Sequence, residues 1–408
     1  MKAEIIAVGT EILVGDIVNT NAQFISRELF SLGIDMYYQT VVGDNKKRLT
    51  DAIAQAFERA DLVIFSGGLG PTEDDLTKET VAAYFEAPLY YDEAIGEDIK
   101  TYFKNRKCPE SNMKQAQIPQ GAMVLANNHG TAPGVILQKE GKIAVLLPGP
   151  PRELIPMFTQ QVMPFLKSRS DYVMESLTLR LFGVGESAVG EMLSDLMAGS
   201  NPTVAPYAKD HEVTLRIAAK AETKDAALSL IEPVHQAIKD RLGEYIYGYD
   251  EEDMPKTVAG LLLEKKITIA CAESCTAGLL TGTLGNIPGI SAVLNESIVT
   301  YSNEAKIKYL GVSPETLERC GAVSSETAGE MAVGIAKTAK TDIGVSITGI
   351  AGPDGGTEEK PVGLVYVGVC YHDQVTVQKL TLKGNRQKIR QAAVLNALNH
   401  VRKRILAE

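Results

Sequence analysis

Apolar positions along the first 168 residues alternate between two periods. Short uninterrupted apolar runs, which are typical of buried strands, take turns with apolar residues spaced three or four apart, which are typical of helices. The predicted elements, in order, are a strand at 5–8, a helix over 24–32 that stops at Gly33, a strand at 36–42, a helix over 49–57 and a strand at 61–66. This order predicts a mainly parallel sheet covered on both faces.

The pattern changes between residues 170 and 250. A strand-like segment at 176–182 precedes a helix near 186–197, and an alternating segment at 213–217 precedes a helix near 223–240. These elements predict a small α+β module with antiparallel character.

An acidic segment that ends in proline, 248–255, is expected to be a linker. A second α/β pattern follows it, with strands near 267–271, 343–348 and 363–370 and a final helix near 385–403. We therefore predict an α/β protein with two mainly parallel α/β domains, at 1–168 and 254–408, joined by the α+β module at 170–250.

Composition restricts the classes of function. Apolar residues make up 45% and charged residues 23% of the chain, and nothing approaches the roughly 18 uninterrupted apolar residues of a membrane span. The N-terminus becomes polar too quickly for a signal peptide, and the five scattered cysteines argue against a disulfide framework, so we expect a cytoplasmic protein. Dispersed histidines argue against a zinc site, and a net charge of −10 argues against nucleic acid as a partner.

Four polar clusters follow predicted strands or enter a predicted helix in the C-terminal segment. They lie at 273–276, 300–306, 348–356 and 384–386. Because ligands collect outside the carboxyl ends of parallel strands, we expect these clusters to converge.

The residue types in these clusters predict nucleophilic catalysis. Ser274 follows a buried strand and precedes a helix-like stretch, where backbone N–H groups favour developing negative charge. A serine hydroxyl needs an adjacent base. No cluster contains a histidine, so Lys306 is the best candidate, provided that burial lowers its pKa. Tyr301 would relay or orient the proton.

Other residues of the clusters are candidates for binding. The glycine-rich turn after Thr348 frees backbone N–H groups for an oxyanion or a phosphate, and Arg386 supplies positive charge to a phosphate. The expected substrate-binding residues of this segment are Glu273, Asn303, Gly349, Gly352 and Lys360.

Each signal alone has a structural alternative. Ser274 could be a helix cap, Asn303 could cap the next helix, and Lys306 could be a solvated surface lysine. The segment at 352–356 could be only a turn, and Arg386 could pair with a surface carboxylate. Because these residues occur together at successive strand ends, the catalytic hypothesis has the same weight as the structural alternatives.

Four segments closely resemble the CinA family of competence/damage-inducible proteins, and the resemblance covers the whole chain. They are Ala-Glu-Ser-Cys-Thr-Ala-Gly (272–278), Thr-Tyr-Ser-Asn-Glu-Ala-Lys (300–306), Gly-Ala-Val-Ser (321–324) and Thr-Gly-Ile-Ala-Gly-Pro-Asp-Gly-Gly (348–356). The resemblance implies that the C-terminal domain deamidates nicotinamide mononucleotide, hydrolysing its carboxamide to the acid and releasing ammonia without a cofactor.

The same resemblance implies roles for single residues. Ser274 matches the family's nucleophile and Lys306 its base, and Tyr301, Thr348 and Arg386 match the remaining motif positions. Ala277 departs from the pattern, because relatives often have glycine there; we expect alanine to fit the first turn of the following helix.

In the N-terminal segment, a loop at 66–77 directly follows a buried strand. Its glycines let the backbone approach a ligand, and the helix expected next would cradle a phosphate. Three consecutive carboxylates at 73–75 suit a divalent cation that bridges to a phosphate, although acidic residues also favour the first turn of a helix. The expected substrate-binding residues here are Gly67, Gly68, Gly70 and Thr72.

The motifs at 67–75 and 148–151 resemble the molybdopterin-binding fold. In CinA-type chains this domain is similar to a metal-dependent ADP-ribose pyrophosphatase, which gives AMP and ribose 5-phosphate. The resemblance implies that Asp74 and Asp75 are metal-binding or catalytic carboxylates, that Glu11 is a further metal ligand, and that the metal is Mg, Mn or Co. Leu69 replaces the threonine usual in molybdopterin-binding relatives, which favours the nucleotide.

The middle module resembles the KH-type domain of the same family. It has no Gly-x-x-Gly loop for RNA, and residues 170–250 contain 7 Lys+Arg against 13 Asp+Glu. A spacer or dimerisation role is therefore favoured, and we expect a homodimer.

The main hypothesis is a bifunctional hydrolase of nicotinamide mononucleotide and ADP-ribose. Two alternatives remain. One is an interaction protein in competence or DNA damage with inactive pockets, and the other is an N-terminal domain that binds molybdopterin.

Overall fold

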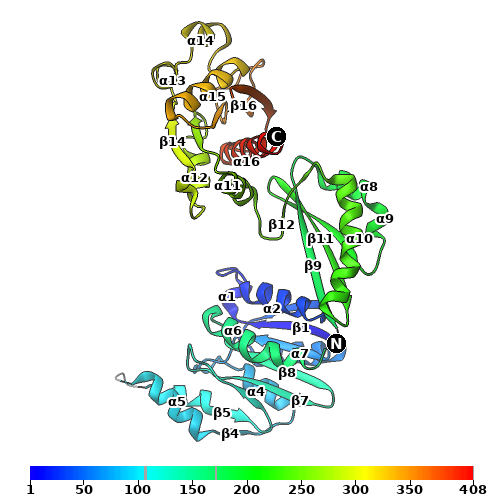
Figure 1. Cartoon of the computed structure of the whole chain (residues 1–408). Helices are drawn as coiled ribbons and strands as arrows, with labels where there is room; N and C mark the ends of the chain where they lie inside the picture. Colours follow the sequence, from blue (N-terminus) through cyan, green and yellow to red (C-terminus); the bar gives the residue numbers. More distant parts are fainter. Residues whose placement is uncertain (105–107, 171, 408) are drawn as a thin grey trace. The chain divides into compact units, whose positions relative to one another are not determined.

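The computed structural model describes residues 1–104, 108–170 and 172–407 (Figure 1). The chain divides into two compact units, Met1–Ser176 with Ala218–Ile231 and Leu177–Ile217 with Glu232–Glu408, so the middle segment contributes to both. The domain boundaries expected from the sequence stay a prediction. None of the described helices combines the length and the apolar character needed to cross a membrane.

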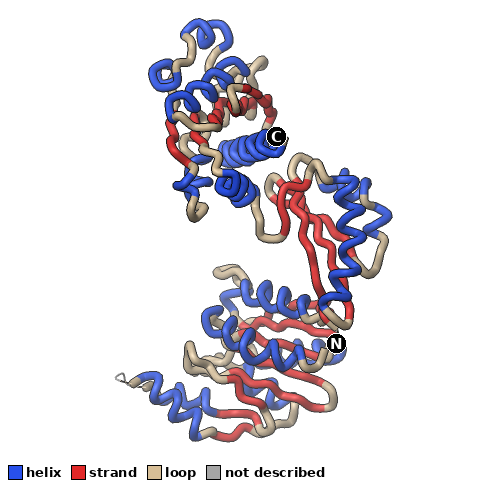
Figure 2. The backbone as a smooth tube through the Cα atoms, in the orientation of Figure 1, coloured by secondary structure: helices blue, strands red, loops and turns tan. Residues whose placement is uncertain are grey.

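The N-terminal part is a three-layer α/β structure in which helices cover a six-stranded sheet (Figure 2). Its elements are β1 (Lys2–Val8), α1 (Thr10–Leu13), α2 (Thr20–Ser31), β2 (Asp35–Val42), α3 (Lys46–Arg59), β3 (Leu62–Ser66), α4 (Thr77–Tyr84), β4 (Leu89–Tyr91), α5 (Glu93–Phe103), η1 (Glu110–Ala116), β5 (Gln117–Pro119), β6 (Met123–Leu125), β7 (Gly134–Lys139), β8 (Lys142–Leu147), α6 (Pro151–Met157), η2 (Phe158–Val162) and α7 (Met163–Lys167). The sheet order is β2-β1-β3-β8-β7-β6; β2, β1, β3 and β8 are parallel, and β7 is antiparallel to both of its neighbours, β8 and β6.

Alternate residues of the central strands supply two separate cores. Ile5 and Ile64 pack with α2 and α6 on one face, whereas Ile6 and Phe65 pack with α3 and α4 on the other. A strand buried on both faces is apolar throughout, because successive side chains point to opposite sides of the sheet. This is why the sequence shows uninterrupted apolar runs at 5–8 and 62–65.

The middle segment forms a four-stranded sheet with helices. Its elements are β9 (Val173–Leu181), α8 (Glu186–Met192), α9 (Ser194–Met197), β10 (Thr203–Lys209), β11 (Glu212–Ala221), α10 (Lys224–Leu242) and β12 (Ile246–Tyr249), and the sheet order is β10-β11-β9-β12. The single helix expected over 186–197 is wrong. Leu193, with φ −118° and ψ 16°, leaves the helical conformation and separates α8 from α9.

The expected linker at 248–255 is shorter than the sequence suggested. Strand β12 extends to Tyr249, and a helix, α11 (Met254–Lys265), already begins at Met254. Asp253 caps this helix by accepting from the Lys256 N–H at 3.0 Å, and Pro255 lies in its first turn, where a proline costs no hydrogen bond. The acidic and proline residues therefore start a helix.

The C-terminal part has a mixed five-stranded sheet in the order β14-β13-β15-β16-β17. Its elements after α11 are β13 (Ile269–Glu273), α12 (Leu279–Gly285), η3 (Ile290–Ala292), β14 (Leu294–Val299), α13 (Asn303–Leu310), α14 (Pro314–Cys320), α15 (Ser325–Ala339), β15 (Ile343–Gly349), β16 (Leu364–Tyr371), β17 (Gln374–Thr381) and α16 (Arg386–Leu406). This arrangement confirms the predicted α/β fold class.

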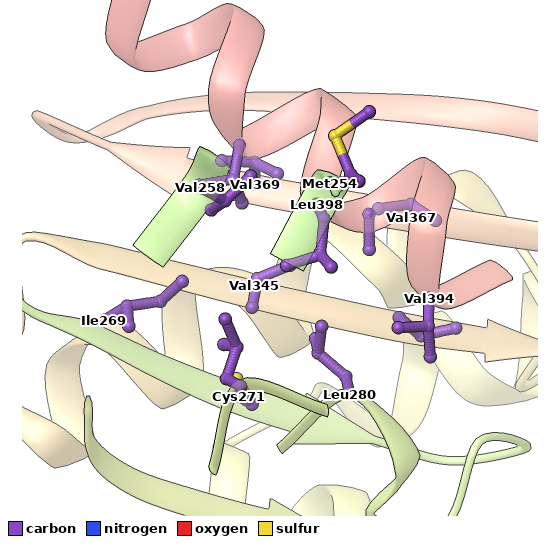
Figure 3. Close-up of a cluster of buried hydrophobic side chains, with 14 of the residues drawn as sticks. Met254, Val258, Ile269, Cys271, Leu280, Val345, Val367, Val369, Val394 and Leu398 are labelled. Atoms are coloured by element: carbon purple, nitrogen blue, oxygen red, sulfur yellow. The ribbon is translucent and has the colours of Figure 1, made fainter. Parts of the chain in front are cut away.

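The main core of this part lies between the sheet and the helices α11 and α16. Figure 3 shows Val345 of β15, Val367 of β16 and Leu398 of α16 gathered in it. On the opposite face α15 packs closely against β15: a Cβ at Gly344 would lie 2.1 Å from the Ala332 carbonyl oxygen. A glycine is required there by the close approach of helix and strand backbones.

Candidate functional site

Four strand ends of the C-terminal sheet open on one edge. Strands β13, β14 and β15 are parallel, and β17 runs in the same direction because β16 is antiparallel to both of its neighbours. The clusters at 273–276, 300–306, 348–356 and 384–386 lie at or just beyond the carboxyl ends of these strands. Hydrogen bonds connect all four.

Ser274 and Lys306 form a buried pair at this edge. The Nζ of Lys306 lies 3.2 Å from Ser274 Oγ, and it donates to the Thr300 carbonyl oxygen at 2.8 Å. Lys306 is 1% exposed and Ser274 is 9% exposed. Among the described residues, no carboxylate lies within 4.0 Å of the Lys306 ammonium. Lys306 is therefore a buried, unpaired lysine and not a solvated surface lysine.

Burial favours the neutral form of two groups beside Ser274, the amine of Lys306 and the thiol of Cys275. Loss of hydration lowers the pKa of Lys306 below its ordinary value, which favours the free amine. Burial raises the pKa of the Cys275 thiol to about 11, and this side chain belongs to the apolar core. Cys275 is consequently a protonated core thiol, which leaves Ser274 as the nucleophile candidate of this turn.

Arg386 joins the other clusters. Its guanidinium donates to the Tyr301 hydroxyl at 3.0 Å and to the Gly352 carbonyl oxygen at 2.8 Å. Arg386 thus holds the strand end after β14 against the loop after β15, and it does not serve the surface ion pair that was the alternative.

Glu273 caps the helix that follows the nucleophile candidate. Its carboxylate, 0% exposed, accepts from the Leu280 N–H at 3.0 Å, the Thr281 N–H at 2.9 Å and the Thr281 hydroxyl at 2.7 Å. Helix α12 therefore begins five residues after Ser274, and the alternative that Ser274 is its cap is wrong. The role of Glu273 in substrate binding stays a prediction, but its engaged carboxylate favours positioning over direct contact.

The expectation for Ala277 is corrected. Ala277 has φ +52° and lies in the turn before α12, not in the first helical turn. Gly278 follows with φ +87°, so two successive residues take left-handed conformations before the helix begins.

The remaining C-terminal candidates have structural contacts of their own. The Thr348 hydroxyl donates to the Ala322 carbonyl oxygen at 2.7 Å, and Lys360 Nζ donates to the Cys320 carbonyl oxygen at 2.6 Å. Both bring the segment at 320–322 toward the site. Asn303 is the exposed first residue of α13, and Ser302 rather than Asn303 caps this helix. Gly349 ends β15, and the N–H of the next residue, Ile350, donates to the Leu364 carbonyl oxygen.

Sequence reasoning missed Arg390. Its guanidinium donates to the Thr276 carbonyl oxygen at 2.6 Å, from a position one helical turn after Arg386. The spacing of four residues on a predicted helix was the available signal.

The N-terminal part contains a cavity of about 560 Å³ at the carboxyl ends of β1, β2, β3 and β8. Every N-terminal site residue expected from the sequence lines it, namely Glu11, Gly67, Gly68, Gly70, Thr72, Asp74 and Asp75. Within the described residues, the lining includes no lysine, arginine or histidine. Its size is in the range of small-molecule sites, roughly 300–1,000 Å³.

The glycines of the loop after β3 are required by backbone geometry. Gly67 has φ +102°, and a Cβ there would lie 2.2 Å from the Val8 carbonyl oxygen. The loop consequently lies directly against the end of β1.

The acidic segment at 73–75 forms a turn before helix α4, which begins only at Thr77. The carboxylate of Asp75 accepts from the Thr72 N–H at 2.9 Å and from the Thr72 hydroxyl, while Lys114 Nζ donates to the Thr72 and Asp75 carbonyl oxygens at 2.8 and 2.6 Å. These carboxylates are not in the first turn of a helix, so the structural alternative for them is wrong. The helix that we expected directly after the glycines therefore begins later in the sequence, at Thr77.

Five carboxylates line the cavity: Glu11, Asp44, Asp74, Asp75 and Glu153. Asp44 already accepts from the N–H and hydroxyl of Thr10 at 3.0 and 2.7 Å, and Glu153 accepts from Asn127 at 2.9 Å. In the described parts of the chain, no three His, Cys, Asp or Glu side chains form a group that could hold a metal ion. This donor set fits a cation held by one or two carboxylates and completed by water and phosphate, as Mg²⁺ usually is. The metal itself stays a prediction.

Sequence reasoning missed three polar residues of the lining: Asp44, Gln115 and Glu153. Asp44 lies two residues after the end of β2 and so shared the strand-end signal of the other candidates. Gln115 carried no such signal, because it belongs to the short helix η1.

The chain matches three family models along its length. They are the probable molybdopterin binding domain over 4–168, the damage-inducible protein CinA KH domain over 176–248 and the CinA C-terminal domain over 251–405.

Two relatives match from end to end. A competence-damage inducible protein of Clostridium beijerinckii is 55% identical over 406 residues, which cover 99% of each chain. A CinA-like protein of Kosmotoga olearia is 54% identical over 409 residues, which cover 100% of this chain and 99% of the relative. Among solved structures, the competence/damage inducible protein CihA of Agrobacterium tumefaciens is 39% identical, with a TM-score of 0.37, and the match covers 37% of this chain and 93% of that chain.

Proposed function

The chain belongs to the CinA family of competence/damage-inducible proteins, and from this premise we propose that it is a bifunctional hydrolase of pyridine-nucleotide breakdown products. The C-terminal site deamidates nicotinamide mononucleotide to nicotinic acid mononucleotide and ammonia. The N-terminal cavity hydrolyses ADP-ribose to AMP and ribose 5-phosphate.

The proposed deamidation proceeds through an acyl-enzyme. Ser274 Oγ attacks the carboxamide carbon while its proton passes to the neutral amine of Lys306, and the same proton then goes to the departing nitrogen, which leaves as ammonia. Water then attacks the resulting ester and gives its proton to Lys306, which passes it to Ser274 Oγ as the ester bond breaks and the acid leaves. One water is consumed for each ammonia formed.

The observation that carries this proposal is the buried pair itself. Neutral Lys306 can donate one hydrogen to the Thr300 carbonyl oxygen, at 2.8 Å, and still accept the Ser274 proton across 3.2 Å. Desolvation lowers the pKa of the lysine, so the free amine is more populated than in water. Arg386 and Arg390 add positive charge suited to the phosphate of the mononucleotide.

The direct test is product identification. The full-length protein is incubated separately with nicotinamide mononucleotide and ADP-ribose, and the products are separated by chromatography. Nicotinic acid mononucleotide with equimolar ammonia, and AMP with ribose 5-phosphate, are the expected products. Failure to release ammonia would exclude the first activity and leave the interaction-protein hypothesis.

Replacing Glu273 by glutamine is expected to lower the rate of deamidation by about 10-fold, with little change in KM. The amide keeps the shape of the side chain but can no longer accept from two helix N–H groups on both of its polar atoms, so the turn carrying Ser274 loosens. Steady-state kinetics with nicotinamide mononucleotide measure the effect.

Glu330→Gln is the matched control for this variant. Glu330 also accepts from a backbone N–H, that of Ser313, and from a threonine hydroxyl, that of Thr316. Both variants should lower the melting temperature, but only Glu273→Gln should slow deamidation. Equal losses of kcat would show that Glu273 matters only for stability.

The cavity in the N-terminal part supports the second activity. It offers carboxylates and backbone N–H groups but no cationic side chain among its described lining, so a diphosphate needs a bridging cation to be bound there. A divalent metal, when bound, would polarise the phosphoryl oxygens for attack by water. Of the three candidates Glu11, Asp74 and Asp75, one or two would supply carboxylates to it, and water and the phosphates would complete its coordination.

Removing divalent cations with a chelator should abolish ADP-ribose hydrolysis and leave ammonia release unchanged. The reason is that the described lining of the N-terminal cavity offers several carboxylates to a metal, whereas the proposed chemistry of Ser274 and Lys306 uses none. Parallel assays with and without chelator, followed by re-addition of Mg²⁺, Mn²⁺ or Co²⁺, measure both activities on one sample. Loss of both activities would contradict the prediction that only ADP-ribose hydrolysis requires a metal.

Molybdopterin binding is a second candidate for the N-terminal cavity, because residues 4–168 match a molybdopterin-binding family model. The buried Leu69, which lines the cavity, argues for the nucleotide. Competition between molybdopterin and ADP-ribose for the cavity decides between them. We also propose that the protein is cytoplasmic and that it is a homodimer. Light scattering of the purified chain tests the oligomeric state.

A further inference from the structure

Two buried amide side chains in the N-terminal cavity each have an acceptor oxygen without a partner. Asn21 of α2 is 8% exposed and Gln115 of η1 is 2% exposed, and both line the cavity. Within the described residues, Asn21 Oδ1 and Gln115 Oε1 are buried and receive no hydrogen bond.

The orientation of both amides is determined by their nitrogen atoms. Asn21 Nδ2 donates to the Gly149 carbonyl oxygen at 2.6 Å and to Ser66 Oγ at 2.9 Å. Gln115 Nε2 donates to the Leu69 carbonyl oxygen at 3.3 Å. A carbonyl oxygen can only accept, so neither amide can be turned over without losing its bond. The oxygens are therefore the atoms left for another partner.

An unpaired buried acceptor costs free energy, and two such atoms at one cavity indicate that something else supplies the donors. Asn21 is attached to Ser66 at the end of β3, and Gln115 to Leu69 in the loop that follows. The cavity also contains five carboxylates, which a cation would prefer to a neutral amide oxygen. The amide oxygens are thus matched to neutral donors, that is, hydroxyl or amino groups of a ligand.

We propose that the amide oxygens of Asn21 and Gln115 are specificity-determining acceptors, which select ligands carrying neutral N–H or O–H donors over ligands that carry only phosphate. The nucleotide class of the ligand rests on the proposed ADP-ribose hydrolysis. In a nucleotide these donors are the ribose hydroxyls or the amino group of the base.

The test measures binding of AMP to the full-length protein in the presence of Mg²⁺ by titration calorimetry, with inorganic pyrophosphate as the probe that lacks such donors. Two variants are compared, Gln115→Met and Gln115→Glu. Both remove the amide nitrogen that donates to Leu69, but only Gln115→Glu keeps an oxygen acceptor. Asn21→Leu and Asn21→Asp form the same pair at the second position.

Gln115→Met is expected to weaken AMP binding by roughly 2- to 10-fold, the worth of one neutral hydrogen bond, and to leave pyrophosphate binding unchanged. Gln115→Glu keeps the oxygen acceptor but adds a negative charge to the cavity, so it should weaken AMP and pyrophosphate binding by the same factor. Equal weakening of AMP and pyrophosphate in both variants would mean that Gln115 only anchors the loop, and unchanged AMP binding in Gln115→Met would mean that its oxygen meets no ligand. Either result overturns the proposal.

Three AMP analogues identify the donor. These are 2′-deoxy-AMP, 3′-deoxy-AMP and IMP, which lack one hydroxyl, the other hydroxyl and the base amino group. The analogue whose affinity Gln115→Met does not change lacks the group that Gln115 recognises. Because the experiment measures binding and needs no turnover, a protein that binds AMP as expected but does not cleave ADP-ribose would refute the proposed function alone.

Discussion

Replacing Ser274 by alanine is expected to reduce ammonia release from nicotinamide mononucleotide by at least about 1,000-fold, while ADP-ribose hydrolysis stays unchanged. Among the described residues, Ser274 Oγ is the only hydroxyl that is hydrogen-bonded to Lys306 Nζ, so the variant cannot form the acyl-enzyme. It should still fold, because Ser274 Oγ has no role in capping α12, which Glu273 performs. Ammonia release and AMP formation are measured on the same preparation.

Ser346→Ala is the matched control. Ser346 is also a buried serine of the C-terminal sheet, but its hydroxyl donates to the Ala328 carbonyl oxygen, on the face covered by α15. Its loss should cost about 1 kcal/mol of stability and no activity per folded molecule. Ammonia release that survives in Ser274→Ala would remove this serine from the mechanism.

Replacing Lys306 by methionine is expected to lower the rate of deamidation by about 100- to 10,000-fold, the usual contribution of a general base. Methionine fills the buried space of the lysine without its nitrogen, so the fold should be retained. Lys308→Met, at an exposed position of the same helix, should keep full activity. A Lys306→Met variant with wild-type kcat would show that another group accepts the proton.

The pH dependence of the same reaction gives a second readout of Lys306. Because the base must be neutral, kcat/KM should rise with pH and level off at the lowered pKa of Lys306, below the ordinary lysine value of 10.5. Between the lowered pKa and 10.5 the unfolded chain binds the proton and the folded chain does not, so stability also rises with pH across this window. In Lys306→Met, neither the residual kcat/KM nor the stability should show this rise with pH.

The candidate site could be predicted from the sequence because its polar residues come directly after the predicted strands. Apolar runs located the strands, and parallel direction then placed Ser274 and the other clusters at one edge. The direction of the later strands was harder to predict. The end of β17 lies at the same edge because the chain reverses direction before β16 and again after it. No local pattern encodes such a reversal.

Local conformation around Ser274 could not be predicted in the same way. Serine before a helix-like stretch is a strong capping signal, yet the cap is Glu273, which reaches forward by seven residues to the Leu280 N–H. This contact displaces the helix start, and Ala277 therefore occupies a left-handed turn. The N-terminal loop differed for a similar reason, because Asp75 closes a turn on Thr72 before α4 can begin.

The spacing along the chain of the residues in each site determines when that site can first form during synthesis. The N-terminal cavity uses residues between Val8 and Glu153. The C-terminal site needs contacts across 32 residues between Ser274 and Lys306 and across 85 residues between Tyr301 and Arg386. Since domains fold from the N-terminus as the chain emerges, the cavity can be complete on the ribosome while the serine site still lacks its last helix. A nascent or truncated chain that stops before Arg386 would thus carry the first site without the second.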